Sequence, residues 1–256
     1  MLLVFDVGNT NTVIGLYSEG KLVKNWRISS CKQTMDEAGS KISGLLFTSG
    51  ISKDKIKACV YSSVVPPLDD VYISAVRDYV GCECIIVSVP TIKSGIEIKI
   101  PEKNSLGADR LLNIIAGRYK YGSPLIVVDL GTAITIDVLD CNGDYIGGAI
   151  SPGMELAANS LFSNAALLPK VSLNVAPRYI ATDTEGAIQS GVVLGTVGIV
   201  DSLLRGTVKE LGTDNCKIVV TGGYSRVYTK YSELECILDP ELTLDGMKII
   251  YEKKMY

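Results

Sequence analysis

Apolar and polar positions along the chain form two similar blocks. Residues 2–27 and residues 125–150 each begin with an apolar run that ends in Asp-x-Gly, and each continues through a second apolar run and a turn to a third. The turns contain Glu19-Gly20 and Asn142-Gly143, pairs that favour β-hairpins. Because the blocks start about half a chain length apart, the sequence predicts an internal duplication of a hairpin-rich half-domain.

Helical and strand patterns alternate after each block. An apolar spacing of about 3.6 residues predicts helices, and short apolar runs predict strands. Helices are predicted at residues 34–49, 68–80, 105–119, 153–163, 185–211 and 241–252, and strands at residues 56–61, 84–89 and 217–220. This alternation indicates an α/β fold with sheets flanked by helices. We expect one subdomain over residues 1–118 and a second over residues 119–256.

Composition and charge exclude several classes of protein. The net charge is −3 and no basic block is present, which argues against nucleic acid as a partner. We find no stretch near the roughly 18 apolar residues of a membrane span, and the first residues lack the basic segment of a signal peptide. We therefore expect a cytoplasmic protein with no nucleic-acid or membrane partner.

The absence of histidine restricts the chemistry further. Without it, Ser-His-Asp and Cys-His catalysis and most zinc hydrolase sites are excluded. The 7 cysteines contain no CxxC pair, and we expect them to be reduced thiols. Acid–base chemistry must then come from Asp, Glu, Lys, Tyr or Cys.

Two Asp-x-Gly turns are the candidate phosphate-binding segments. The first runs from Asp6 to Thr12 and the second from Asp129 to Ala133. Backbone N–H groups of such turns can hold phosphate oxygens, although tight hairpins capped by Asp or Asn have the same composition. Strand ends of an α/β sheet meet at a crevice, where two such turns would hold a polyphosphate from both sides. Thr221-Gly222-Gly223 follows a later strand and suits an adenosine, but glycine also simply ends strands.

The order of these motifs resembles the phosphate 1, phosphate 2 and adenosine motifs of the actin, hexokinase and Hsp70 superfamily. Six blocks narrow the resemblance: DVGNTNTVIGL at 6–16, GADRLLNIIAG at 107–117, VVDLGTAITIDVL at 127–139, GGAISPGMELAANSLF at 147–162, AIQSG at 187–191 and TGGYS at 221–225. Together they resemble type III pantothenate kinase, the bacterial enzyme of the first step of coenzyme A synthesis. The resemblance implies a duplicated actin-like ATPase (ribonuclease H-like) fold, with two mixed sheets around a nucleotide cleft. It also implies ATP-dependent phosphorylation of pantothenate to 4′-phosphopantothenate.

The resemblance implies a role for each matching residue. Asp109 is implied as the catalytic proton acceptor, Asp129 as the ligand of a monovalent cation (potassium or ammonium), and Asp6 as the carboxylate near Mg²⁺. The implied ATP contacts are Asp6, Val7, Gly8, Asn9, Thr10, Asn11, Thr12, Val13 and Thr132. The implied pantothenate contacts are Gly107, Ala108, Asp109, Arg110 and Thr184, together with the position of Ile100. The resemblance further implies a homodimer, with the helix after AIQSG near the subunit contact.

Two features leave alternatives open. The residues Gly107 to Arg110 alone are also typical of a helix N-terminus with a surface Asp–Arg pair. Ile100 stands where the family usually has a tyrosine of a Tyr-x-Asn-Pro motif, which favours another small-molecule kinase of the same superfamily as the main alternative. A non-enzymatic regulator, like the Bvg accessory factors, is a further alternative. The complete set of Asp6, Asp109 and Asp129 argues against a loss of catalysis.

Overall fold

The computed structural model describes residues 1–165, 167–173, 177–213 and 215–256. The chain forms two compact units. Unit 1 contains Met1–Ile96, Pro101–Ala116 and Leu242–Tyr256, and unit 2 contains Glu97–Ile100 and Gly117–Glu241. The boundary between Ala116 and Gly117 falls within helix α3 (Ala108–Tyr121), close to the expected division between residues 118 and 119. The units also exchange segments that the sequence does not indicate, since residues 97–100 join unit 2 and residues 242–256 return to unit 1.

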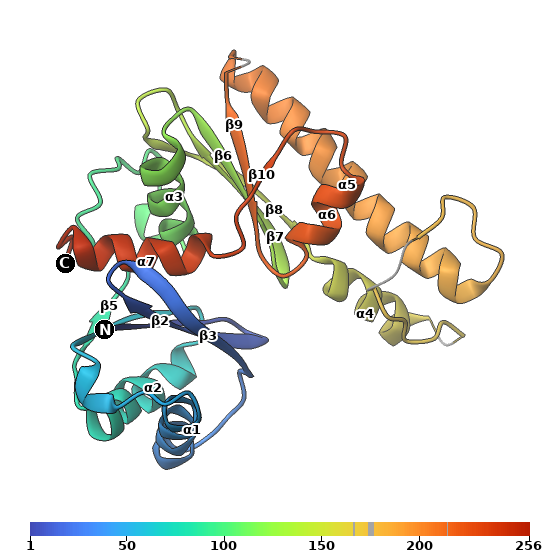
Figure 1. Cartoon of the computed structure of the whole chain (residues 1–256). Helices are drawn as coiled ribbons and strands as arrows, with labels where there is room; N and C mark the ends of the chain where they lie inside the picture. The colour runs from blue at the N-terminus through green and yellow to red at the C-terminus, as the bar shows by residue number, and fades with distance from the viewer. Residues whose placement is uncertain (166, 174–176, 214) are drawn as a thin grey trace. The chain divides into compact units, whose positions relative to one another are not determined.

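Unit 1 is built on a mixed sheet in the order β3-β2-β1-β4-β5. Its strands are β1 Leu2–Val7, β2 Asn11–Ser18, β3 Lys21–Ser29, β4 Ala58–Ser63 and β5 Cys84–Ile86. The helices α1 (Met35–Thr48) and α2 (Asp69–Ala75, continued by a π-helix over Val76–Val80) lie on one side of this sheet (Figure 1). Leu3 and Phe5 of β1 are buried in one core cluster with residues of these helices. Helix α7 (Leu242–Glu252) packs against β1 and β4. The sheet therefore has helices on both faces.

Unit 2 repeats this plan with a second sheet in the order β10-β9-β6-β7-β8. Its strands are β6 Leu125–Leu130, β7 Ala133–Leu139, β8 Tyr145–Pro152, β9 Lys217–Thr221 and β10 Ile237–Leu238. Its helices after α3 are α4 Met154–Asn164, α5 Thr184–Leu211 and α6 Ser225–Tyr231. Val193, Val200 and Leu204 of α5 are fully buried in one core cluster with Ile126 and Val128 of β6.

The two sheets confirm the predicted duplication. In each sheet the first strand of the block is antiparallel to the next strand and parallel to a strand from later in the chain: β1 pairs with β2 and β4, and β6 pairs with β7 and β9. Within each block the third strand then pairs antiparallel with the second. The fold is therefore a duplicated α/β fold of two mixed sheets flanked by helices, as the sequence predicts.

Helix α5 corrects one expectation from the sequence. By length and composition it could cross a membrane, since an 18-residue window of it has a mean hydropathy of 1.6. A core helix of a soluble protein has the same properties, and 44% of that window is buried within the protein. Its buried residues pack on the sheet of unit 2, so core packing explains the apolar residues on that face of α5.

Candidate active site

The first Asp-x-Gly turn lies at the carboxyl end of β1 in unit 1. The amide of Gly8 donates to the carbonyl oxygen of Asn11 at 3.0 Å, which closes the turn. A Cβ at position 8 would lie 3.1 Å from the same oxygen, so glycine suits this close approach. Asn9 and Thr10 at the tip are exposed. The turn thus presents short polar residues and backbone to solvent, as a phosphate-binding turn requires.

Thr12, at the end of this turn, is held by hydrogen bonds of its side chain. Its side chain is fully buried, and its Oγ1 is 2.9 Å from Oγ of Ser30. The hydroxyl of Tyr72 donates to Thr12 Oγ1 at 3.4 Å and accepts from Nε2 of Gln33 at 2.8 Å. The side chain of Thr12 therefore anchors the β1–β2 hairpin on helix α2, and its predicted contact with ATP stays a prediction.

Asp109 occupies the first turn of helix α3, also in unit 1. The helix begins at Ala108 and not at Ser105, which lies in a 3₁₀ turn and donates its hydroxyl to the carbonyl of Glu102 at 2.6 Å. Oδ1 of Asp109 accepts from the amide of Arg110 at 2.8 Å. A Cβ at Gly107 would clash with this Oδ1, so the glycine leaves room for the carboxylate.

The second Asp-x-Gly turn lies at the carboxyl end of β6 in unit 2. The amide of Gly131 donates to the carbonyl of Ala133 at 3.1 Å, and the amide of Gly153 donates to the carbonyl of Thr132 at 3.0 Å. A Cβ at Gly222 would clash with Oδ1 of Asp129. Two glycines thus allow the start of α4 and the Thr221-Gly222-Gly223 segment to approach the Asp129 turn closely.

Tyr224 joins the glycine segment to α4, a contact that the sequence analysis missed. Its amide donates to the carbonyl of Leu130 at 3.1 Å, and its hydroxyl donates to Oε1 of Glu155 at 2.8 Å. Burial and then this hydrogen bond raise the pKa of Tyr224. Both residues are inside recognised blocks, TGGYS and GGAISPGMELAANSLF, but nothing in either block indicates that they meet.

Ile100 lies in unit 2, beside strand β8. Its Cγ2 is 3.9 Å from the position of a Cβ at Gly147. The segment before it is held by backbone hydrogen bonds, from the amide of Lys99 to Tyr145 at 2.8 Å and from Tyr145 to Glu97 at 2.9 Å. Ile100 is therefore on an ordered segment, and an aliphatic side chain stands where a tyrosine was expected.

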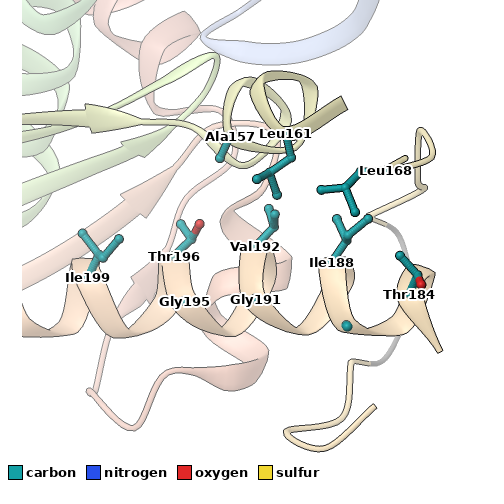
Figure 2. Close-up of a pocket in the computed structure, with 11 residues that line it drawn as sticks. Ala157, Leu161, Leu168, Thr184, Ile188, Gly191, Val192, Gly195, Thr196 and Ile199 are labelled. Atoms are coloured by element: carbon teal, nitrogen blue, oxygen red, sulfur yellow. The ribbon is translucent and has the colours of Figure 1, made fainter. Parts of the chain in front are cut away.

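Thr184 begins helix α5 and lines an apolar pocket between α4 and α5, with a volume of about 520 Å³ (Figure 2). Asp183 caps the helix by accepting from the amide of Gly186 at 2.8 Å. In Figure 2, Ala157 and Leu161 of α4 face Val192 and Ile188 of α5. The only polar side chains that line this pocket are those of Thr184 and Thr196, among the residues that the structure describes.

Comparison with known proteins identifies the family. The family model for type III pantothenate kinase matches residues 2–206. A type III pantothenate kinase of Pelobacter propionicus is 40% identical over 254 residues, which cover 99% of each chain. That of Geobacter sulfurreducens is 39% identical, again over 99% of each chain. The chain belongs to the type III pantothenate kinase family.

Solved structures support the fold. A putative Baf family transcriptional activator of Campylobacter jejuni aligns over 98% of each chain with a TM-score of 0.59 at 24% identity. A ROK hexokinase of Thermus thermophilus aligns over 99% of each chain with a TM-score of 0.51 at 13% identity. At these identities the likeness concerns the fold alone, and it agrees with the actin and hexokinase superfamily inferred from the motif order.

The residues that match the pantothenate kinase motifs form two groups. Unit 1 holds the Asp6 turn and the Asp109 helix, and unit 2 holds the Asp129 turn, Ile100 and Thr184. The prediction that both turns face one crevice stays a prediction. Within the described ranges, no three Cys, Asp or Glu side chains cluster in a way that could hold a metal ion.

Proposed function

We propose that the chain transfers the γ-phosphate of ATP to the primary hydroxyl of pantothenate, with Asp109 as the proton acceptor. As a member of its family the chain is a phosphotransferase that acts on an alcohol group, a pantothenate kinase of coenzyme A biosynthesis. The family match over most of the chain is the observation that carries this proposal. It favours pantothenate over another kinase substrate and catalysis over a regulatory role.

Asp109 suits the role of base by its chemistry and position. With no histidine in the chain, a carboxylate is the natural acceptor for the hydroxyl proton. Its hydrogen bond with the amide of Arg110 fixes the carboxylate at the start of α3. In phosphoryl transfer such an aspartate orients the nucleophile and accepts its proton, while most of the rate comes from positioning. Arg110 next to it would bind the carboxylate of pantothenate.

The Asp6 turn suits Mg-ATP. Mg²⁺ is commonly held by one or two carboxylates together with phosphates and water, so the single carboxylate of Asp6 fits this donor set. The bound ion would neutralise charge on the phosphates. The exposed backbone of the turn at Asn9 and Thr10 would hold phosphate oxygens.

The Asp129 turn suits a monovalent cation. One carboxylate with nearby carbonyl oxygens offers a single negative charge and neutral oxygen donors, which suit a weakly hydrated monovalent ion such as potassium or ammonium. Gly222 supports this role because a side chain there would fill the space beside Asp129 Oδ1. Thr132, in the same turn, is the proposed further contact with ATP.

The α4–α5 face is our proposed homodimer contact. Leu156, Leu161, Phe162 and Ile199 are each at least 41% exposed on these two helices. Exposed large apolar side chains mark a site of association when they form a continuous patch. Thr184 lines the pocket in this face, so the contact would lie next to a proposed pantothenate residue. We further propose a cytoplasmic location, where ATP and the substrates of coenzyme A synthesis are found.

The decisive experiment incubates the purified protein with Mg-ATP and pantothenate, in potassium buffer and separately in sodium buffer. Mass spectrometry then detects phosphopantothenate. We expect product that depends on potassium and that falls at least about a thousandfold in Asp109→Asn, because the variant has lost its base.

Asp70→Asn is the matched control, since Asp70 is an exposed carboxylate in the first turn of helix α2. It should retain full activity. If the folded, ATP-binding protein gives no product, pantothenate is not the acceptor, and a panel of alcohols becomes the next test. Equal activity in sodium would contradict the proposed cation site alone.

A further inference from the structure

Ser62 carries a buried hydroxyl that the fold does not use. It lies on β4, its side chain is 1% exposed, and none of the described residues forms a hydrogen bond with its Oγ. A buried polar group without a partner destabilises the folded state. Only Tyr231 on α6 has a side-chain oxygen in the same condition within the described part of the chain. Such a group calls for an explanation beyond packing.

The strand pairing puts Ser62 beside Asp6. In the parallel pair of β1 and β4, Asp6 is the register partner of Ser62. Register partners on neighbouring strands point to the same face of a sheet, and the strands lie about 4.8 Å apart. The pairing continues past this point, since the amide of Val64 donates to the carbonyl of Val7 at 3.0 Å. The hydroxyl is therefore on the same face of the sheet as the carboxylate, on the neighbouring strand.

The hydroxyl of the neighbouring Ser63, in contrast, forms a hydrogen bond within the fold. Its Oγ accepts from the amide of Val65 at 3.0 Å and so closes the turn that follows β4. As the next residue along the strand it points to the opposite face from Ser62. The two adjacent serines thus offer a matched comparison: one hydroxyl serves the fold and the other does not.

We propose that Ser62 is a positioning residue for Asp6, with its hydroxyl donating to one carboxylate oxygen while the other oxygen faces the magnesium of bound Mg-ATP. This inference rests on the proposed role of Asp6. A carboxylate has two oxygens and can serve both partners at once. The carboxyl ends of β1 and β4 lie side by side, at the edge of the sheet where α/β folds bind ligands. At this edge Ser62 lies next to the Asp6 turn, where a hydrogen bond can set the orientation of the Asp6 carboxylate. The hydroxyl, which the fold leaves unsatisfied, thus gains its partner when the nucleotide binds.

The test separates stability from nucleotide binding. Thermal unfolding of wild type, Ser62→Ala, Ser63→Ala and Tyr231→Phe is measured with and without Mg-ATP. Ser62→Ala should keep or raise the melting temperature without nucleotide, because it removes an unsatisfied polar group, but the shift induced by Mg-ATP should shrink. The apparent KM for Mg-ATP should rise about tenfold, the loss expected for one hydrogen bond to a charged group, with an unchanged KM for pantothenate.

The control variants should alter stability without altering the stabilisation by Mg-ATP. Tyr231→Phe should have the melting temperature of the wild type or a higher one, and Mg-ATP should raise it by as much as in the wild type. Ser63→Ala should have a lower melting temperature than the wild type, and Mg-ATP should again raise it by the full amount. Ser62→Cys, which keeps the size but donates weakly, should behave as Ser62→Ala does. A full Mg-ATP shift in both Ser62 variants would overturn the inference, as would a loss of stability without nucleotide. If wild type itself shows no Mg-ATP shift and no product, the proposed function fails instead.

Discussion

Lys99 links the segment that carries Ile100 to the turn between β7 and β8. Its ammonium group lies 2.9 Å from a carboxylate oxygen of Asp140 and 2.9 Å from one of Asp144. The hydrogen bond from Lys99 lowers the pKa of Asp144, and the two carboxylates raise the pKa of Lys99. This small network orders the approach to a position expected to contact the substrate.

We predict that Lys99→Met weakens the fold at neutral pH only. The pKa of Asp144 is lower in the folded state, so the stability it contributes is present above its unfolded pKa and is lost as the pH falls through its folded pKa. Urea midpoints of wild type and variant should differ at neutral pH and converge at acid pH. NMR titration should show a higher pKa for Asp144 in the variant.

Lys24→Met, at an exposed position on β3, serves as the control and should leave both the urea midpoint and the titration of Asp144 unchanged. A constant difference between Lys99→Met and wild type across the pH range would show that the loss is one of packing and not of charge.

The candidate residues of the site could be named from the sequence, but their contacts within the fold could not. Asp6, Asp109 and Asp129 stand out because Asp-x-Gly turns and a helix start leave a local signature. In the sequence, Thr12 resembles the other polar residues of the phosphate-binding turn. In the structure its side chain is buried and accepts a hydrogen bond from Tyr72. Ser62 stands in an apolar run with no local signal, and only strand pairing brings it to Asp6. The local sequence indicates which side chains have suitable chemistry, whereas the residues that they contact depend on how the strands pair.

At the scale of single elements, helix α5 combines a core face with an exposed small-residue face. Gly191 and Gly195 are exposed one turn apart and line the pocket beside α4. A Cβ at either position would meet nothing within 4 Å in the single chain. These glycines therefore have no packing role in the single chain, although glycine lowers helix stability by about 1 kcal/mol relative to alanine.

We predict that Gly195→Ala has opposite effects on the fold and on association. The free energy of unfolding should rise by about 1 kcal/mol from helix propensity. The proposed homodimer should weaken, because the added methyl groups would separate the two subunit surfaces. Analytical ultracentrifugation over a dilution series measures the second effect.

Gly206→Ala on the same helix is the matched control, since that glycine is also exposed and a Cβ there would meet nothing within 4 Å. It should stabilise the helix by a similar amount and leave the dimer intact. Unchanged dimer affinity in Gly195→Ala would place the subunit contact elsewhere.

The bounds of elements follow from the sequence less well than their existence. Each helix predicted in the second half is present, with ends within a residue or two of the prediction. Helix α3 starts later than expected because Ser105 uses its hydroxyl in a 3₁₀ turn with Glu102, leaving Ala108 as the first helical residue. A serine before an apolar run predicts a helix cap only when no turn competes for its side chain.

For the molecule as a whole, the sequence predicts the duplication but does not predict which sheet the last helix, α7, packs against. Two Asp-x-Gly blocks half a chain apart predict two equivalent sheets. Nothing in the apolar pattern of residues 241–252 indicates which sheet that helix covers. In the structure, Gly246 of α7 lies against the backbone of Leu112 of α3, and Thr243 donates to Oδ1 of Asn113 at 2.8 Å.

We predict that Gly246→Ala destabilises unit 1 selectively. Its Cβ would clash with the carbonyl of Leu112, which belongs to a buried helix and cannot easily move, at a cost of about 1–3 kcal/mol. Hydrogen exchange should become faster in β1 and β4, against which α7 packs, and change less in β6 and β9. Gly44→Ala on α1, where a Cβ meets nothing, is the control and should slow exchange or leave it unchanged.

The return of α7 to unit 1 also constrains biosynthesis. A ribosome delivers residues 97–241 as one nearly continuous stretch, so unit 2 can fold while translation is still under way. Unit 1 receives its first strands early and α7 much later, so β1 and β4 must wait for that helix until residues 242–252 have left the ribosome. During that interval the face of β1 that carries Val4 lacks its cover, since Val4 and Leu244 both adjoin Gly15 in the finished fold. Until α7 arrives, this apolar face stays exposed, and exposed apolar surface makes a partly folded chain prone to aggregation.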